Sequence, residues 1–406
     1  KTYCRVGKAS AIIGCLAMNL ALLTGIYAIL GGLGLGIFLW GKPDGNSIFD
    51  RLYRLVCVIL PENIKKVVRK CLGQRAAEFL DWLWEYLCYT SNPLVQIFYL
   101  LVVVGGYLVY VAYGYPHVPG RLVGAHHKYL GFVNFTICLS VWWKACRTDP
   151  GMVTSENVEQ LCELYPWDEV MFAKQTCRTC DVVKPARSKH CGLCGICVTR
   201  FDHHCIWINN CVGVGNHRWF LAFLFWHTVF CLYGASLGTI ILYDIVISQK
   251  LLEAVFVDPV TKERHQATNM IVMQYLLGKE AMVIFVTILA MVMGLVLAGF
   301  MLWHFNLVRM GTTTNELSKW NYIVWALKQE GDEGKKRAKE LKNIYNKGAV
   351  SNFREVFFPI DVHDLPKVAQ SEASAKAVRG TESSMARKGK DNEDVRKRPK
   401  GKKADG

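Results

Sequence analysis

Four long stretches of this 406-residue chain contain no Asp, Glu, Lys or Arg. They are residues 9–40, 90–116, 219–243 and 281–303. A helix of about 20 apolar residues is long enough to cross the roughly 30 Å hydrocarbon core of a bilayer. The missing charge therefore predicts four membrane-spanning helices and argues against a wholly soluble protein.

A fifth uncharged stretch is shorter. Tyr129–Trp143 lies between Lys128 and Lys144, whose side chains can reach the two membrane interfaces. We expect this segment to cross the membrane as well. A short helix buried in the protein is the alternative interpretation.

Other absences narrow the class of protein. No ten-residue segments of alternating hydrophobicity are present, which excludes a transmembrane β-barrel. The net charge of +15 has no basic folded face to go with it, so we expect attraction to anionic lipid and no nucleic-acid partner. No charge lies in the middle of a predicted span, which disfavours a transporter or channel.

What is abundant is cysteine, in one short block. Residues 177–211 hold seven cysteines and three histidines, at spacings typical of tetrahedral zinc sites. Interleaving the Cys-x2-Cys pairs predicts two sites, each with three thiolates and one imidazole. The first set is Cys177, Cys180, His190 and Cys197, and the second is Cys191, Cys194, His204 and Cys211. Spacing alone also allows a sequential assignment with other partners.

Two zinc ions use eight ligands and leave three reactive groups. These are Asp202, His203 and Cys205, a carboxylate, an imidazole and a thiol within four residues. An imidazole can take the proton of a thiol, and a carboxylate can orient the imidazole. The residues therefore suggest nucleophilic catalysis by Cys205. A structural or protein-binding zinc module, such as a membrane-anchored RING-like adaptor, is equally compatible with the spacing.

The cysteine block and the basic loops predict the same orientation. Thiolate ligands favour a reducing compartment, which places the block in the cytosol. Counting spans then puts the 41–93 loop in the cytosol, and that loop carries eight Lys or Arg residues, whereas the 114–125 loop carries only Arg121. Lys1, Arg5 and Lys8 run against this rule, because they precede the first span on the predicted lumenal side.

The predicted fold class is an all-α polytopic membrane protein with a small cytosolic zinc-binding cysteine-rich domain. An apolar stripe at helical spacing over residues 64–87 predicts an interfacial amphipathic helix, or alternatively one packed on the cytosolic domain. No internal repeat is apparent. The predicted organisation is an N-terminal segment with the first span (1–40), a cytosolic loop with the interfacial helix (41–93), the second and third spans (94–143), the zinc domain (144–216), the fourth span (217–247), a lumenal loop (248–280), the fifth span (281–307), a cytosolic C-terminal region (308–364) and a disordered basic tail (365–406).

Several motifs in the chain resemble those of one family. They are Cys177-Arg-Thr-Cys180, Lys184-Pro-Ala-Arg-Ser-Lys-His-Cys191, Asp202-His-His-Cys205 and Asn209-Asn-Cys-Val-Gly213. Together they resemble the DHHC family of protein S-acyltransferases (palmitoyltransferases). Thr313-Thr-Asn-Glu316 matches the TTxE element of that family, and Asn352–Phe358 is similar to its C-terminal aromatic motif. The Asp168–Phe172 stretch and the long loop before the second span look most like member four of the family.

The resemblance implies a two-step thioester exchange. Cys205 would attack a long-chain acyl-CoA such as palmitoyl-CoA, with His203 as general base and Asp202 as its orienting acid. The acyl group would then pass to a cysteine of a membrane-associated protein substrate. Thr313 or Thr314 would approach Asp202.

The resemblance also implies binding and supporting roles. Asn352 would seat the C-terminal segment on the helix bundle, and Lys184 and Arg187 are the expected contacts for CoA phosphates. Ile206 stands where many relatives carry proline. We expect His217 to lie on the surface and His227 to be a packing histidine. The expected location is the endoplasmic reticulum, with the Golgi or plasma membrane as alternatives.

Overall fold

The computed structural model describes residues 3–5, 45–257 and 262–359. The predicted first span at 9–40 and the predicted disordered tail at 365–406 lie outside these residues. Within them, three helical segments are long and apolar enough to cross a membrane: Leu94–His117, His217–Ser248 and Ala281–Arg309. They correspond to the predicted second, fourth and fifth spans, and the last two extend several residues beyond the uncharged stretches.

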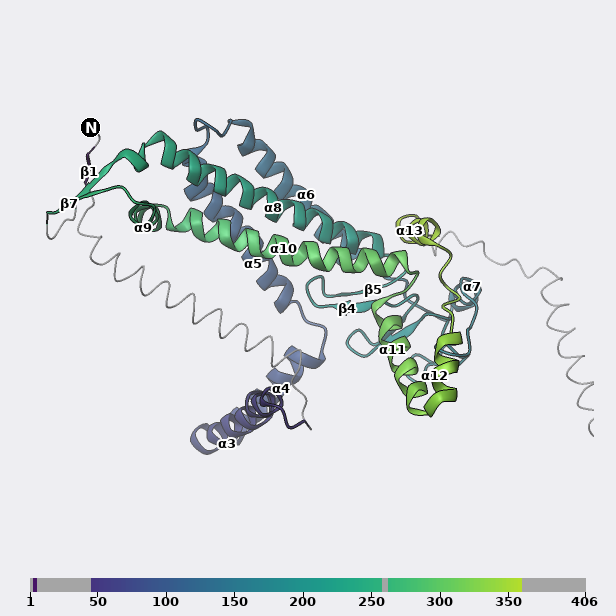
Figure 1. Cartoon of the computed structure of the whole chain (residues 1–406). Coiled ribbons are helices and arrows are strands. Elements are labelled where there is room, and N and C mark those ends of the chain that lie inside the picture. The colour runs from purple at the N-terminus through teal and green to yellow at the C-terminus, as the bar shows by residue number, and fades with distance from the viewer. Residues whose placement is uncertain (1–2, 6–44, 258–261, 360–406) are drawn as a thin grey trace, which may run out of the picture.

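The spans form a bundle of long helices (Figure 1). The first segment consists of α5 (Leu94–Val109), a π-helical turn, η2 (Tyr110–Gly114), and a 3-10 turn, η3 (Tyr115–His117). The others are α8 (His217–Ser248) and α10 (Ala281–Arg309), which lie side by side along most of their length. Their outward faces remain apolar, as expected of helices whose solvent is lipid.

The predicted third span forms a longer helix than its uncharged core suggests. α6 (His126–Arg147) has 22 residues and runs beside α8. At 1.5 Å per residue it is about 33 Å long, which is sufficient for a crossing. Its ends carry His, Lys and Arg, and it is absent from the segments that qualify by apolar composition alone. That α6 crosses the membrane remains a prediction.

A small sheet lies at the end of the bundle beyond α8 (Figure 1). After η4 (Leu251–Glu253) come β6 (Val255–Val257), β7 (Arg264–Gln266) and α9 (Asn269–Lys279). β6 pairs antiparallel with β7 and parallel with β1 (Tyr3–Arg5), with Tyr3 opposite Val255. The N-terminal strand is therefore at the same end as the 248–280 loop.

The segment before α5 contains several helices, where the stripe at 64–87 predicted one. They are α2 (Ile48–Arg54), η1 (Leu55–Ile59), α3 (Leu60–Leu72) and α4 (Gln74–Tyr89). Gly73 separates α3 from α4 with a φ of 86°, a conformation that glycine adopts without a Cβ clash. Ile64, Val67 and Phe79 are exposed, which is compatible with the predicted interfacial location.

The other end of the bundle carries the cysteine block and the C-terminal helices. The block contains α7 (Val158–Glu163), β2 (Lys189–Cys191), β3 (Ile196–Val198), β4 (His203–Cys205) and β5 (Asn210–Val212). α11 (Thr314–Gln329), α12 (Gly331–Glu340) and α13 (Ala349–Phe357) follow α10. Gly331 separates α11 from α12 with a φ of 83°, and Gly334 lies buried inside α12.

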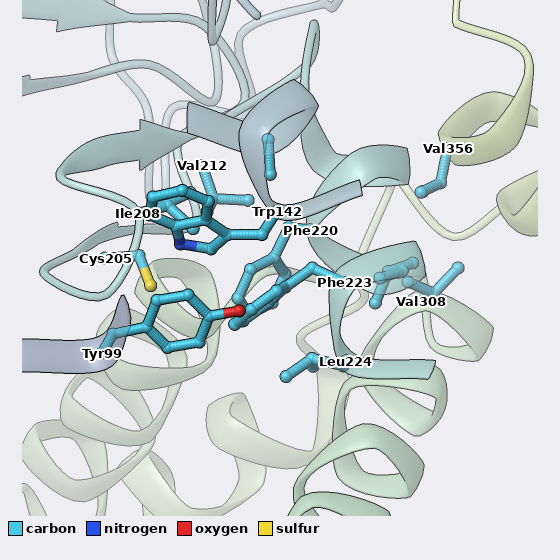
Figure 2. Close-up of a cluster of buried hydrophobic side chains, with 12 residues drawn as sticks. Tyr99, Trp142, Cys205, Ile208, Val212, Phe220, Phe223, Leu224, Val308 and Val356 are labelled. Carbon is cyan, nitrogen blue, oxygen red and sulfur yellow. The ribbon is translucent and has the colours of Figure 1, made fainter. Parts of the chain in front are cut away.

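A buried apolar cluster joins the bundle to the cysteine block (Figure 2). Tyr99 of α5, Trp142 of α6 and Phe220 and Phe223 of α8 pack against Cys205. Cys205 is 6 % exposed, and its sulfur lies beside the rings of Tyr99 and Trp142. The candidate nucleophile is therefore at the junction between the block and the membrane helices.

Candidate catalytic and metal site

Two β-hairpins of identical register form the cysteine block. β2 pairs antiparallel with β3, and β4 pairs with β5. His190 lies opposite Cys197 in the first hairpin, and His204 lies opposite Cys211 in the second. Each hairpin thus brings one imidazole and one thiol together across its two strands.

The first predicted ligand set converges on one point. His190 Nδ1 lies 3.6 Å from Cys177 Sγ, 3.3 Å from Cys180 Sγ and 3.8 Å from Cys197 Sγ. With Zn–S near 2.3 Å and Zn–N near 2.05 Å, a tetrahedral ion separates N and S ligands by roughly 3.6 Å. The four atoms therefore fit around a tetrahedral metal ion.

The second predicted set has the same geometry. His204 Nδ1 lies 3.7 Å from Cys191 Sγ, 3.2 Å from Cys194 Sγ and 3.7 Å from Cys211 Sγ, and the last two sulfurs are 3.6 Å apart. Both sets are among the groups of side chains that could hold a metal ion. The structure thus brings together the eight residues in the interleaved pairing and not in a sequential one.

The two sets are related by a constant offset in sequence. Adding 14 to the numbers of the first set gives those of the second, ligand by ligand. The expectation of no internal repeat is therefore wrong for this block. A short repeat escapes detection here because only the ligands and the strand register are shared.

Asp202 and His203 form a hydrogen-bonded pair outside both sets. His203 Nδ1 donates to Asp202 Oδ2 at 2.7 Å, which leaves the other ring nitrogen for the Cys205 thiol. Burial would lower the pKa of His203, but hydrogen bonds to Asp202 and to Cys205 raise it to about 10. Burial would also raise the pKa of Asp202, but His203 and neighbouring histidines hold it well below its usual range. The pair thus favours a carboxylate facing an imidazolium.

The Thr-Thr-Asn-Glu segment holds Asp202 in place. The Thr314 amide donates to Asp202 Oδ1, and the Thr314 hydroxyl donates to the Asp202 carbonyl, each at 2.7 Å. Thr313 donates to the Phe201 carbonyl and caps α11 in a capping box with Glu316. The structure thus places Thr314 against Asp202, and Thr313 against the residue before it.

The predicted contact between Arg187 and a CoA phosphate does not fit the structure. Arg187 is 1 % exposed, and its guanidinium donates to both Glu316 carboxylate oxygens at 2.6 and 2.7 Å. It also pairs with Glu355 and lies over the rings of Tyr165 and Tyr345. Arg187 joins the cysteine block to α11 and α13 and offers no exposed donor.

Lys184, the other predicted phosphate contact, belongs to a basic group that includes two lysines not predicted from sequence. Burial lowers the pKa of Lys319, and the charges of Lys184 and Lys189 lower it further. Lys189 lines a pocket of about 670 Å³ that also reaches Asp202 and His203. The sequence signal for Lys319 was weak, because it lies on α11, more than a hundred residues from the block, in no recognisable basic motif.

Asn352 fixes α13 to the end of α10. Its amide donates to the Arg309 carbonyl at 3.0 Å and to Asn346 Oδ1 at 2.8 Å, and its oxygen accepts from the Lys347 amide. The side chain is buried between the two elements. The structure thus places Asn352 where the C-terminal segment meets the helix bundle, as its expected seating role requires.

Two other histidines were predicted with different outcomes. His217 is 1 % exposed, so its expected surface location is wrong, because its ring packs against Arg200, Phe220 and His304. His227 packs inside the bundle, where it accepts a hydrogen bond from Tyr99 and donates to the Phe223 carbonyl. His304, which was not predicted, is also buried and lies near Asp202.

Comparison with known proteins identifies the family. Residues 171–321 match the family model of the DHHC palmitoyltransferase. Palmitoyltransferase ZDHHC4 of Mus musculus is 31 % identical over 324 residues, covering 77 % of this chain and 91 % of the relative. The chain belongs to the DHHC palmitoyltransferase family.

Other relatives of the DHHC palmitoyltransferase support the same assignment. Palmitoyltransferase ZDHHC4 of Rattus norvegicus is 32 % identical over 323 residues, with coverage of 77 % and 91 %. Palmitoyltransferase swf1 of Schizosaccharomyces pombe is 27 % identical over 344 residues, covering 77 % of this chain and 89 % of the relative. The resemblance to member four thus extends far beyond the cysteine block.

Proposed function

We propose that this DHHC palmitoyltransferase moves a long-chain acyl group from acyl-CoA to Cys205 and then to cysteines of membrane-associated proteins. The observation that carries the proposal is the Asp202–His203 pair, closed at 2.7 Å beside a cysteine that neither ligand set uses. A structural zinc module has no need of a buried carboxylate–imidazole pair next to a spare thiol.

In the first step the Cys205 thiolate attacks the carbonyl carbon of the acyl-CoA thioester. The bond from that carbon to the CoA sulfur breaks, and His203 gives its proton to the departing thiolate. In the second step His203 takes the proton of a substrate cysteine, whose thiolate attacks the acyl group on Cys205. The bond to Cys205 then breaks, which restores its thiolate for the next cycle.

Two zinc ions complete the site in this proposal. The thiolate-rich sets fit zinc in ligand type and in separation. With all ligand positions filled by protein, the ions would supply structural support and no open coordination position. Their part would be to lock the two hairpins, which in turn fix where His203 and Cys205 point.

The surroundings of Cys205 suit a lipid thioester. The acyl chain would leave the sulfur toward the apolar cluster of Tyr99, Trp142 and Phe223, away from water. Each CH2 so buried contributes about 0.8 kcal/mol. The CoA phosphates would lie near Lys184, Lys189 and Lys319 on the cytosolic side.

The cysteine block would face the cytosol, where acyl-CoA is available and thiols stay reduced. We infer residence in the endoplasmic reticulum, or in the Golgi or plasma membrane, with the bilayer itself as a partner. No nucleic-acid partner is proposed.

Acyl labelling of the purified protein tests the proposal. Wild-type protein incubated with labelled palmitoyl-CoA should carry a label that hydroxylamine removes, because a thioester forms on Cys205. Cys205→Ser should carry none. Cys162→Ser, which alters a half-buried cysteine of α7 outside both ligand sets, should label like wild type. Full labelling of Cys205→Ser would contradict the proposal.

A further inference from the structure

Asp202 has two histidine neighbours besides His203. Its carboxylate, the His217 imidazole and the His304 imidazole each have a nitrogen or oxygen within 4.8 Å of the others. All three side chains are 1 % exposed. The carboxylate already accepts from Thr314 and His203, so its remaining lone pairs face these two rings.

Arg200 determines which atom of His217 bears a proton. Arg200 Nη1 lies 3.1 Å from His217 Nδ1, and a guanidinium can only donate. Nδ1 is therefore the acceptor, and the proton of neutral His217 is on Nε2. That Nε2 is buried and has no hydrogen-bond partner among the described residues.

His304 is a second buried imidazole without a partner in the described part of the chain. Neither ring nitrogen makes a hydrogen bond, yet Nδ1 lies 3.9 Å from Asp202 Oδ2. The rings of Phe220 and Phe300 surround it at centroid distances of 5.0 and 4.6 Å. An unpaired buried polar group costs stability, so its retention at this spot calls for a function.

A metal ion does not account for this group. An ion held by His217 would need the Nε2 lone pair and would place the ring proton on Nδ1, facing the Arg200 N–H. The Arg200 charge beside the ring opposes a second cation there as well. His217 and His304 instead form a set of N–H donors around a carboxylate.

We propose that His304, assisted by His217, is a positioning residue that holds the Asp202 carboxylate directed at His203 during acyl transfer. The inference rests on the proposed function of Asp202 and His203. His304 belongs to α10 and His217 to the start of α8, so two membrane helices meet at the carboxylate. A movement of roughly 1 Å would bring His304 Nδ1, now 3.9 Å from Asp202 Oδ2, to hydrogen-bond distance of the carboxylate.

The same chain of contacts reaches α13. Arg200, which fixes His217, also pairs with Glu355 at 3.2 Å, and Glu355 accepts from Tyr165 at 2.9 Å. The orientation of Asp202 thus depends on α13 as well as on the membrane helices α8 and α10.

Substitution of His304 tests the proposal in the full-length enzyme. His304→Phe keeps the ring and removes the donor, so the rate of Cys205 acylation at saturating palmitoyl-CoA should fall about tenfold with KM unchanged. His304→Asn places an amide Nδ2 near the position of Nδ1 and should stay within about threefold of wild type. His127→Phe, which removes a half-buried imidazole paired with Tyr233 at the far end of the bundle, should act like wild type.

A double-mutant cycle separates positioning from structural support. In the Asp202→Asn background, His304→Phe should lower the rate by less than about twofold, because the carboxylate it acts through is gone. A wild-type rate for His304→Phe, or a tenfold loss in both backgrounds, would overturn the inference. If His304→Phe loses zinc, the acylation rate of His304→Asn alone is compared with that of wild type. A tenfold loss in His304→Asn would then overturn the inference. An active Cys205→Ser would instead refute the proposed function.

Discussion

At the scale of single residues, Arg187 shows how a charge can mislead. It lies in a basic segment beside Lys184, and from sequence both suit a phosphate. Its partner Glu316 is 129 residues away, so nothing local indicates burial. Burial would lower the pKa of Arg187, but Glu316 raises it well above its usual range. The pair is a permanent ionic link between the cysteine block and α11.

This pair leads to a prediction for stability. Arg187→Gln should lower the free energy of unfolding by about 3–5 kcal/mol, because Glu316 is left buried without its partner. Lys335→Gln, which breaks the exposed pair with Asp332, should cost less than about 1 kcal/mol. Denaturant titration of both variants in one detergent measures the difference. Equal effects would show that the Arg187 pair is solvated and not buried.

The proposed catalytic residues Asp202, His203 and Cys205 could be singled out from sequence because they lie within four residues and remain after eight ligands are assigned to two metal sites. The supporting residues could not. His217 is next to Arg218 in a polar stretch, and His304 lies within a predicted span. Only the folded chain brings both to Asp202, since α8 and α10 approach the second hairpin from different parts of the sequence. The expected surface location of His217 is wrong for that reason, and the proximity of His304 to Asp202 was not predicted.

At the scale of elements, the 14-residue offset explains why Cys205 is free. Carried one step further, the offset maps Cys191 to Cys205 and Cys194 to Ile208. Ile208 is 0 % exposed and packs in the apolar cluster with Cys205. A side chain without a metal-binding atom thus stands where the repeat would place a ligand. Cys205 therefore occupies the first ligand position of a third copy of the pattern, whose second position is not a metal ligand.

The repeat predicts that the two sites lose metal separately. Cys180→Ser removes a ligand of the first set only, so the purified protein should hold about one zinc ion in place of two and aggregate, because structural metal binding supplies folding energy. Metal analysis by mass spectrometry measures the ratio. Cys162→Ser should retain both ions. Two zinc ions in Cys180→Ser would show that this thiol is not a ligand.

The lengths of elements were less predictable than their existence. Charge-free stretches located the three described spans because lipid excludes charged side chains, yet α8 and α10 extend past their uncharged stretches. Apolar periodicity at 64–87 continues through Gly73 and conceals the break between α3 and α4. Periodicity reports which face is apolar, whereas a positive φ determines where the helix stops.

At the scale of the whole molecule, the site is a junction of three parts. The hairpins supply His203 and Cys205, α11 supplies Thr314, and the bundle supplies the apolar cluster under the sulfur. Acyl transfer needs a water-soluble CoA and a lipid chain at one sulfur. A cysteine held between a polar block and apolar helices meets both requirements.

The arrangement of the ends supports the proposed orientation. β1 pairs with β6, so the N-terminal strand and the 248–280 loop share one end of the bundle, whereas the hairpins lie at the other (Figure 1). This arrangement agrees with the orientation from the span count. It disagrees with the orientation that the basic residues Lys1, Arg5 and Lys8 alone would suggest. We therefore expect both the N-terminal strand and that loop on the lumenal side.

Glycosylation mapping in cells tests this orientation. An Asn-X-Thr acceptor inserted between Val257 and Lys262 should be glycosylated, because only the lumenal side meets the glycosylating enzyme. The same acceptor at the turn between α11 and α12, next to Gly331, should stay unmodified, since that turn lies with the cysteine block. The readout is a gel shift reversed by a glycosidase, measured in variants that still acylate Cys205. Modification next to Gly331 with none at 257–262 would show the opposite orientation. The thiolate ligands would then face an oxidising compartment, where free thiols do not persist.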